Sequence, residues 1–167
     1  AGVYAFEFSS GTNTDLDYIA FDVLVESDVT VAASGVTKME LEVLDLSRSD
    51  VVLRDDLIKA GFTTVGKSEG RIWGYADGTT FRVYVRVDAA CTLKISLAGF
   101  GGKALNAYTY KFGDMAIVPA DGAVLGNGAV AEGVIGTVEV AEAGVYAFEF
   151  SSGTNTDLDY IAFEVVA

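Results

Sequence analysis

Histidine is absent from this chain of 167 residues, and cysteine, proline and tryptophan each occur once. Without histidine, the commonest general base, the Ser-His-Asp triad and the usual zinc ligand are all missing. Cys91 has no second cysteine with which to form an internal disulfide, so packing or strand pairing must hold the fold together. We therefore expect a protein that is not an enzyme.

Positive charge is scarce as well, because 11 Lys and Arg stand against 24 Asp and Glu and leave a net charge of −13. Such a chain repels the phosphates of nucleic acids and the surfaces of anionic membranes, and we expect neither as a partner. The apolar runs are shorter than the length that spans a bilayer, so we expect no membrane insertion. No signal-peptide pattern is found, and we expect a mature chain or an internal fragment.

One long segment of the chain occurs twice. Ala1 to Phe21 and Ala143 to Phe163 are the same 21 letters, AGVYAFEFSSGTNTDLDYIAF, at an offset of 142 residues. Packing constrains only size and polarity at alternate positions of a strand, so identity over this length indicates a copied segment. Three origins fit: a unit cut from an array of near-identical tandem domains, an engineered duplication, or a natural subunit that keeps one copy and lends the other.

The repeated segment alternates apolar and polar residues with a period of two, which is typical of β-strands. The turn sequence at residues 11–14 separates its two halves, so we expect a hairpin with one aromatic and aliphatic face. We predict that residues 1–25 form a terminal hairpin copy that pairs with a neighbouring unit, and that residues 26–167 form a β-sandwich domain ending in the second copy. The predicted assembly anchors are Tyr4, Phe6, Phe8, Ile19 and Phe21, with Tyr146, Phe148, Phe150, Ile161 and Phe163 in the second copy.

Many short strands are predicted between the two copies. Asp77-Gly78 is a type I′ turn signal and predicts a hairpin between the strands that flank it. A helical pattern covers residues 49–60, and Gly61 supplies a stop signal. The strand patterns fall at residues 29–33, 38–46, 71–76, 79–88, 92–97, 107–112, 115–118 and 130–140. Together they predict an all-β protein, an antiparallel β-sandwich of jelly-roll or Ig-like type with one short helix.

Residues 61–68 read GFTTVGKS and match the phosphate-binding pattern G-x-x-x-x-G-K-[ST]. A working P-loop follows a buried strand and opens a helix whose N-terminus meets the phosphate. Here the helical pattern comes first and a strand pattern beginning at Arg71 follows, so we expect no nucleotide site at Lys67.

Oxygen-bearing side chains alternate in both copies of the repeat, and oxygen ligands spaced in this way are able to gather around Ca²⁺. The glycine and the distal glutamate of an EF-hand loop are missing, and Asn and Asp are also ordinary turn formers. We favour turn formation, keep calcium as the alternative, and expect no other cofactor. The residues concerned are Asn13, Asp15 and Asp17, with Asn155, Asp157 and Asp159 in the second copy.

Aromatic side chains near the Asp77-Gly78 turn offer flat surfaces on which sugar rings stack. Trp73, Tyr75 and Tyr84 are the candidates for such a glycan site. Aromatic residues of a sandwich more often fill its core, and that is the favoured interpretation.

The closing strands resemble those of jelly-roll carbohydrate-binding modules, in which an A-G-x-Y strand precedes a final D-Y-I strand. The matching residues run from Ala143 to Phe150 and from Leu158 to Phe163. This resemblance implies a module that binds glycans and often holds a structural calcium. The spare copy of the segment resembles, in architecture, the donor-strand systems of pilins and other extracellular β-filaments.

Two functions follow from these patterns. The favoured hypothesis is a structural, self-assembling module of an extracellular surface or filament protein, joined head to tail with copies of itself by strand complementation. The alternative is a glycan-binding β-sandwich of adhesin type at the cell surface. An acidic sandwich without histidine also fits a capsid decoration protein.

Overall fold

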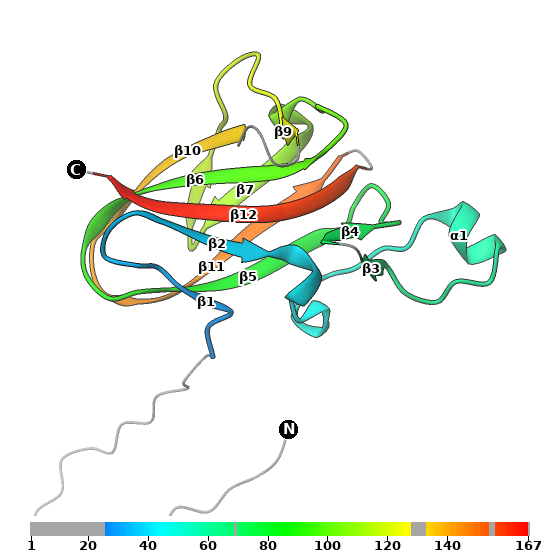
Figure 1. The fold of residues 1–167 in the computed structure, drawn as a ribbon, viewed down its shortest axis with the longest axis horizontal. Coiled ribbons are helices and arrows are strands. Elements are labelled where there is room, and N and C mark those ends of the chain that lie inside the picture. The colour runs from blue at the N-terminus through cyan, green and yellow to red at the C-terminus, as the bar shows by residue number, and fades with distance from the viewer. Residues whose placement is uncertain (1–25, 69, 128–132, 154–155, 167) are drawn as a thin grey trace, which may run out of the picture.

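Figure 1 shows the computed structural model, which describes residues 26–68, 70–127, 133–153 and 156–166. The first copy of the repeat, with the anchors predicted for residues 1–25, lies outside the described residues. The first elements are β1 (Val29–Thr30), β2 (Val36–Glu40), two 3-10 helices (Leu41–Val43 and Leu46–Arg48), α1 (Asp55–Lys59), β3 (Gly66–Ser68), β4 (Arg71–Trp73) and β5 (Thr80–Val87). They are followed by β6 (Cys91–Phe100), a 3-10 helix (Leu105–Ala107), β7 (Tyr108–Phe112), β8 (Met115–Ile117), β9 (Gly126–Asn127), β10 (Gly133–Val140), β11 (Gly144–Ser152) and β12 (Asp157–Val166).

The strands form two sheets. Sheet A has five strands in the order β1-β5-β11-β7-β8. Sheet B has seven, with β10-β6-β12-β4-β3 as its main path, β2 pairing with β12, and β9 pairing with β6. Two short pairs, β1 with β5 and β6 with β9, are parallel, and the remaining pairs are antiparallel. The predicted all-β antiparallel sandwich with one short helix is confirmed.

The core lies between the sheets and is rich in aromatic rings. Phe81 of β5 stacks on Phe150 of β11 with ring centroids 5.0 Å apart, and Tyr75 meets Phe81 edge to face at 5.1 Å. Sheet B contributes mainly aliphatic side chains, and Leu93, Ile95, Leu97 and Ile161 are fully buried. Burial alternates along the strands, which is why the period of two in the sequence identifies the residues that face inward.

The second copy of the repeat builds the centre of both sheets. β11 lies between β5 and β7 in sheet A, whereas β12 lies in sheet B between β6 and the strands β2 and β4 (Figure 1). The hairpin predicted for this copy is therefore wrong, because its two strands do not pair with each other. They form an arch, and the apolar face of β11 packs on the apolar face of β12 through Phe148 and Phe163.

The hairpin predicted at Asp77-Gly78 is also wrong, for a related reason. β4 belongs to sheet B and β5 to sheet A, so the turn carries the chain from one sheet to the other. Gly74 and Gly78 have φ angles of 82° and 88°, a region that favours glycine, and they bend the chain on either side of the buried Tyr75.

Most of the other predicted elements are present, with different ends. The predicted helix over residues 49–60 is reduced to α1 at Asp55–Lys59, since Asp50 forms a β-bridge to Thr80 of β5 and Leu53 forms one to Tyr75. The strand expected over residues 38–46 ends at Glu40 and continues as 3-10 turns. The short strands β3 and β9 were not predicted. Within the described residues, no helix has the length and apolar character that crossing a membrane requires.

Candidate functional site

A groove of about 600 Å³ runs along the outer face of sheet A. We call it the sheet A groove. Side chains from β5, β11, β7 and β8 line it, together with Asp50, with Asn106 of the 3-10 helix before β7, and with the two residues after β8. The complete lining is Asp50, Thr80, Arg82, Asn106, Tyr108, Thr109, Tyr110, Lys111, Ala116, Ile117, Val118, Pro119, Glu149 and Ser151. Its volume lies in the range of known small-ligand sites, roughly 300–1,000 Å³.

Strand register arranges the polar groups of the groove in two parallel rows. Glu149 of β11 stands opposite Arg82 on one side and opposite Lys111 on the other, giving a row of alternating charge. The second row consists of hydroxyl groups, because Ser151 stands between Thr80 and Thr109 in the same manner. Residues opposite each other in adjacent strands bring their side chains close together on the same face, so these rows form a continuous polar surface.

The charged row is held by direct contacts. Arg82 Nε donates to Glu149 Oε1 at 2.6 Å, and Arg82 Nη2 lies 3.7 Å from Asp50 Oδ2. The hydrogen bond to Glu149 raises the pKa of the Arg82 guanidinium above its ordinary value. In the second row, Thr80 Oγ1 and Ser151 Oγ are 2.8 Å apart. Lys111 and Thr109 are exposed and leave donors facing the groove.

One wall of the groove is apolar. Val118 is 85% exposed and follows β8, with Ile117 and the buried Pro119 on either side of it. Pro119 lies just beyond the strand end, where no ladder hydrogen bond is lost. The groove thus combines a polar floor with an apolar wall.

Two tyrosines at the groove are structural. Tyr110 Oη donates to the carbonyl oxygen of Leu105 at 3.0 Å, and both Tyr108 and Tyr110 are almost fully buried. Burial raises the pKa of Tyr108 to about 12 and raises that of Tyr110 above its usual range. Neither phenol ionises at neutral pH, so the groove carries two carboxylates against one guanidinium and one ammonium group.

The three aromatic residues predicted for a glycan site do not come together. Tyr75 is 0% exposed and its hydroxyl accepts a hydrogen bond from the backbone N–H of Thr156, so it belongs to the core. Tyr84 lies on sheet A with the Arg48 guanidinium 4.5 Å from its ring centroid. Trp73 lies on β4 of sheet B. Tyr75 is thus excluded as a stacking surface because no part of its ring reaches the solvent.

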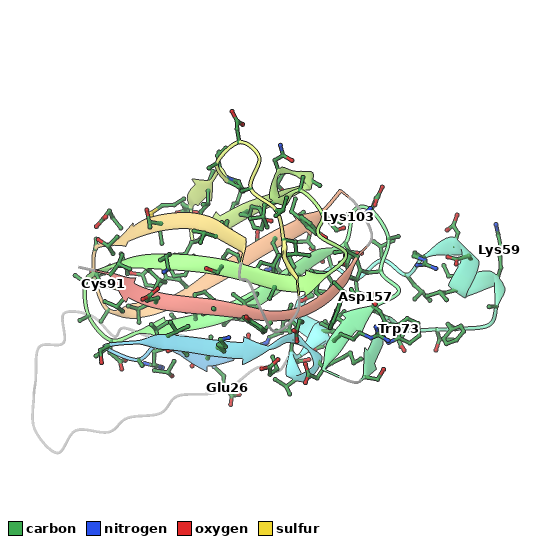
Figure 2. The ribbon with its side chains drawn as sticks, turned by 45° about the horizontal axis from the view of Figure 1, so that its top comes forward. Glu26, Lys59, Trp73, Cys91, Lys103 and Asp157 are labelled. Carbon is green, nitrogen blue, oxygen red and sulfur yellow. The ribbon has the colours of Figure 1, made fainter. Side chains whose placement is uncertain are left out.

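Trp73 belongs to a second aromatic surface at one end of the sandwich (Figure 2). Phe62, which is 47% exposed, meets it edge to face at 6.1 Å, and Trp73 Nε1 donates to Ser68 Oγ at 3.2 Å. Phe100, 40% exposed, lies under the Arg71 guanidinium. We call Phe62, Trp73 and Phe100 the aromatic end.

The carboxylates predicted as calcium ligands are only partly described. Asp157 forms an ion pair with Arg71 at 3.0 Å. Burial, followed by the charge of Glu42, raises the pKa of Asp159. In the described ranges, no group of three or more acidic or thiol side chains is arranged to hold a metal ion. Asn13, Asp15, Asp17 and Asn155 lie outside those ranges, so calcium binding stays a prediction.

Residues 61–68, which match the phosphate-binding pattern, differ in local structure from a P-loop. Gly66–Ser68 is strand β3, paired with β4, and no helix begins there. Lys67 Nζ donates to the carbonyl oxygen of Leu44 at 2.5 Å. The lysine is thus engaged with the backbone rather than aimed at a phosphate cradle.

Comparison with solved structures places this architecture among known sandwiches. A β-(1,4)-mannanase of Podospora anserina that combines GH26 and CBM35 units matches 80% of this chain with a TM-score of 0.51 and 14% identity. The likeness establishes the fold alone. The chain spans 28% of that enzyme, so it corresponds to one part of it. A C-terminal CBM6 of a laminarinase from Zobellia galactanivorans matches 78% of this chain, and 99% of its own length is covered, with a TM-score of 0.48 and 14% identity.

Neither the protein-family models nor the curated proteins contain a match to this sequence.

Sequence reasoning did not find the sheet A groove. Its strands each show the signal, since Thr109 and Lys111 alternate with buried tyrosines and Glu149 and Ser151 alternate with buried phenylalanines. These alternations identify outward residues but not which strands are neighbours. The site depends on β11 lying between β5 and β7, and that order requires the structure.

Proposed function

We propose that this chain is a non-catalytic carbohydrate-binding β-sandwich module that holds a neutral glycan in the sheet A groove. The supporting observation is the pair of polar rows beside an apolar wall. Sugar hydroxyls both donate and accept hydrogen bonds, and each sugar ring also has apolar C–H faces. A surface with donors, acceptors and an apolar wall is complementary to such a ligand.

The charge of the groove favours a neutral ligand over an ionic one. Asp50 and Glu149 are balanced by Arg82 and Lys111, whereas the chain as a whole carries a net charge of −13. An anionic ligand would be repelled by the net negative charge of the whole protein and by the two carboxylates in the groove. A cationic ligand would have to displace Arg82 from Glu149. The hydroxyl groups of a neutral polyol can donate hydrogen bonds to the carboxylates of the groove and accept them from its cationic groups. Such a ligand is neither repelled by the net charge nor required to break the ion pair of Arg82 with Glu149.

The similar mannanase structure carries a CBM35 unit, which supports the same class of function for a chain with this fold. A module of this kind works outside the cell, where polysaccharides are found, so we propose an extracellular or cell-surface location. Self-assembly through the repeated segment would be a property separate from glycan binding.

The decisive experiment is a binding screen on neutral polysaccharides, including β-1,4-mannan, followed by titration calorimetry on the strongest ligand. Thr109→Ala and Lys111→Ala each remove an exposed donor from the groove, and each is expected to weaken binding roughly tenfold. Thr63→Ala and Lys59→Ala remove the same side chains from exposed positions outside the groove and are expected to leave affinity unchanged.

Two outcomes would overturn the proposal. A screen without binding at millimolar ligand concentrations excludes the function. Binding that Trp73→Ala abolishes, while Lys111→Ala leaves it intact, assigns the ligand to the aromatic end instead of the groove.

A further inference from the structure

The arch formed by β11 and β12 occupies a central slot in the sandwich. β11 pairs with β5 and β7, and β12 pairs with β6, β2 and β4. Removing both strands would therefore leave unpaired backbone groups on both sides of a gap in each sheet. It would also uncover the core, because Phe148, Phe150, Ile161 and Phe163 are all 0% exposed. We call this position the arch slot.

The first copy of the repeat carries every side chain that the arch slot recognises up to Phe163. Residues 1–21 and 143–163 are identical, so Phe6 corresponds to Phe148 and Phe21 to Phe163. The correspondence continues with conservative changes, since Asp22-Val23-Leu24 matches Glu164-Val165-Val166. A sandwich cannot distinguish the two segments by their contacts as far as Phe163. Only the covalent connection decides which of them fills the slot.

We propose that the arch slot is an acceptor site for residues 1–24 of a second copy of this chain. The slot holds residues 144–166 of the same molecule, so residues 1–24 of a second molecule enter it by replacing that segment, whose side chains they reproduce as far as Phe163. Strand complementation of this type joins chains through main-chain hydrogen bonds and buried side chains. A donor at one end and an acceptor in the body make the contact heterologous, and such contacts lead to open chains of molecules when they do not close.

The chain contains its own matched control, which makes a sharp test available. The second-copy variant carries Phe148→Asp and Phe163→Asp, which place charges in the arch slot and prevent residues 144–166 from filling it. The first-copy variant carries the corresponding changes, Phe6→Asp and Phe21→Asp. A fourfold variant carries all four changes. Each full-length protein is examined by circular dichroism and by size-exclusion chromatography with light scattering over a hundredfold range of concentration.

We expect the first-copy variant to be a folded monomer with wild-type dichroism, and the fourfold variant to be unfolded. The second-copy variant is expected to keep its β-sheet signal by accepting residues 1–24 of its neighbours. Its weight-average mass should rise with concentration to at least twice the 17.5 kDa of one chain.

Three results would overturn the inference. The second-copy variant could be as unfolded as the fourfold variant, which would show that the first copy does not fill the slot. It could be folded and monomeric at all concentrations, which would show that the first copy closes its own sandwich. The first-copy variant could unfold, which would show that both copies are needed in one molecule. None of these results bears on glycan binding, which is measured on the wild-type chain.

Discussion

Phe148 and Phe163 meet edge to face, with ring centroids 6.0 Å apart and ring planes at 89°, although they belong to opposite sheets. Edge-to-face geometry is a favourable arrangement of two aromatic rings. Through this contact, residues from the two halves of the second copy bury each other's aromatic rings. Each half has one apolar face, and the arch turns these faces toward each other, so the segment alone supplies one full cross-section of the core.

The first prediction concerns Phe112, a core residue that lies outside the repeated segment and so has no second copy in the chain. Phe112 of β7 stacks on Tyr146 at 5.2 Å and is 0% exposed. Phe112→Ala leaves a cavity that no other residue fills, and we expect it to lower the free energy of unfolding by about 3–5 kcal/mol. Phe6→Ala, in the first copy, should change that free energy little. Urea denaturation of both variants measures the difference, and equal losses would contradict this view of the core.

The second prediction concerns the pH dependence of stability near Asp159. Burial is the main cause that raises the pKa values of Asp159 and of Glu40 in β2. The negative charge of Glu42 raises both pKa values further, and the charge of Asp159 also raises that of Glu40. Lys38 lowers both pKa values, but by less. A carboxyl group with a raised pKa binds more protons in the folded than in the unfolded state. The free energy of unfolding therefore falls as the pH rises from the ordinary pKa, near 4, through the raised one.

Asp159→Asn removes this contribution. The variant should be more stable than the wild type at pH 7, and the two should converge below pH 4. Thermal unfolding at a series of pH values tests the sign. Asp157→Asn, two residues earlier, removes the partner of Arg71 and should not stabilise the protein at pH 7. If the wild type were more stable than Asp159→Asn at pH 7, the raised pKa of Asp159 in the folded state would be contradicted.

The third prediction separates Tyr75 from ligand binding. Its hydroxyl accepts a hydrogen bond from the Thr156 backbone N–H inside the core. Tyr75→Phe keeps the ring and removes that acceptor, so we expect a loss of about 1 kcal/mol in unfolding free energy. Glycan affinity should be unchanged, because no part of Tyr75 reaches the surface. If Tyr75→Phe lowered the glycan affinity while its stability stayed nearly normal, Tyr75 would have to be counted as part of the glycan site.

The fourth prediction uses the single tryptophan as a reporter. A β-carbon added at Gly66 would lie 2.1 Å from the Trp73 ring, so Gly66→Ala must displace that ring from β3. We expect the tryptophan emission to shift to the red as Trp73 leaves Phe62 and becomes more exposed to water. Gly61→Ala is the control, because its β-carbon has open space and the substitution strains the backbone at a φ of 89° without filling the room around Trp73. Unshifted emission in Gly66→Ala would contradict the described packing.

Much of the fold follows from alternation along single strands. The sequence shows that Phe148 and Phe150 face one way and Glu149 the other, and the structure agrees. Alternation does not show which strand lies beside which, so an arch and a hairpin look the same. The hairpin predicted at Asp77-Gly78 is wrong for this reason, since the glycine suits a tight hairpin and a crossing between sheets equally well. Tyr75, buried between the two bends, packs against Phe81 of β5 after the chain has left β4 of the other sheet.

We propose that a neutral glycan binds along β5, β11 and β7 on the outer face of sheet A. The most direct test is an NMR titration of the labelled protein with the oligosaccharide selected by the binding screen. We expect the amide shifts of Arg82, Thr109, Lys111 and Ser151 to change, while the Trp73 indole signal stays in place. Shifts that gather at Trp73 and Phe62, or a spectrum that does not change at saturating ligand, would contradict it.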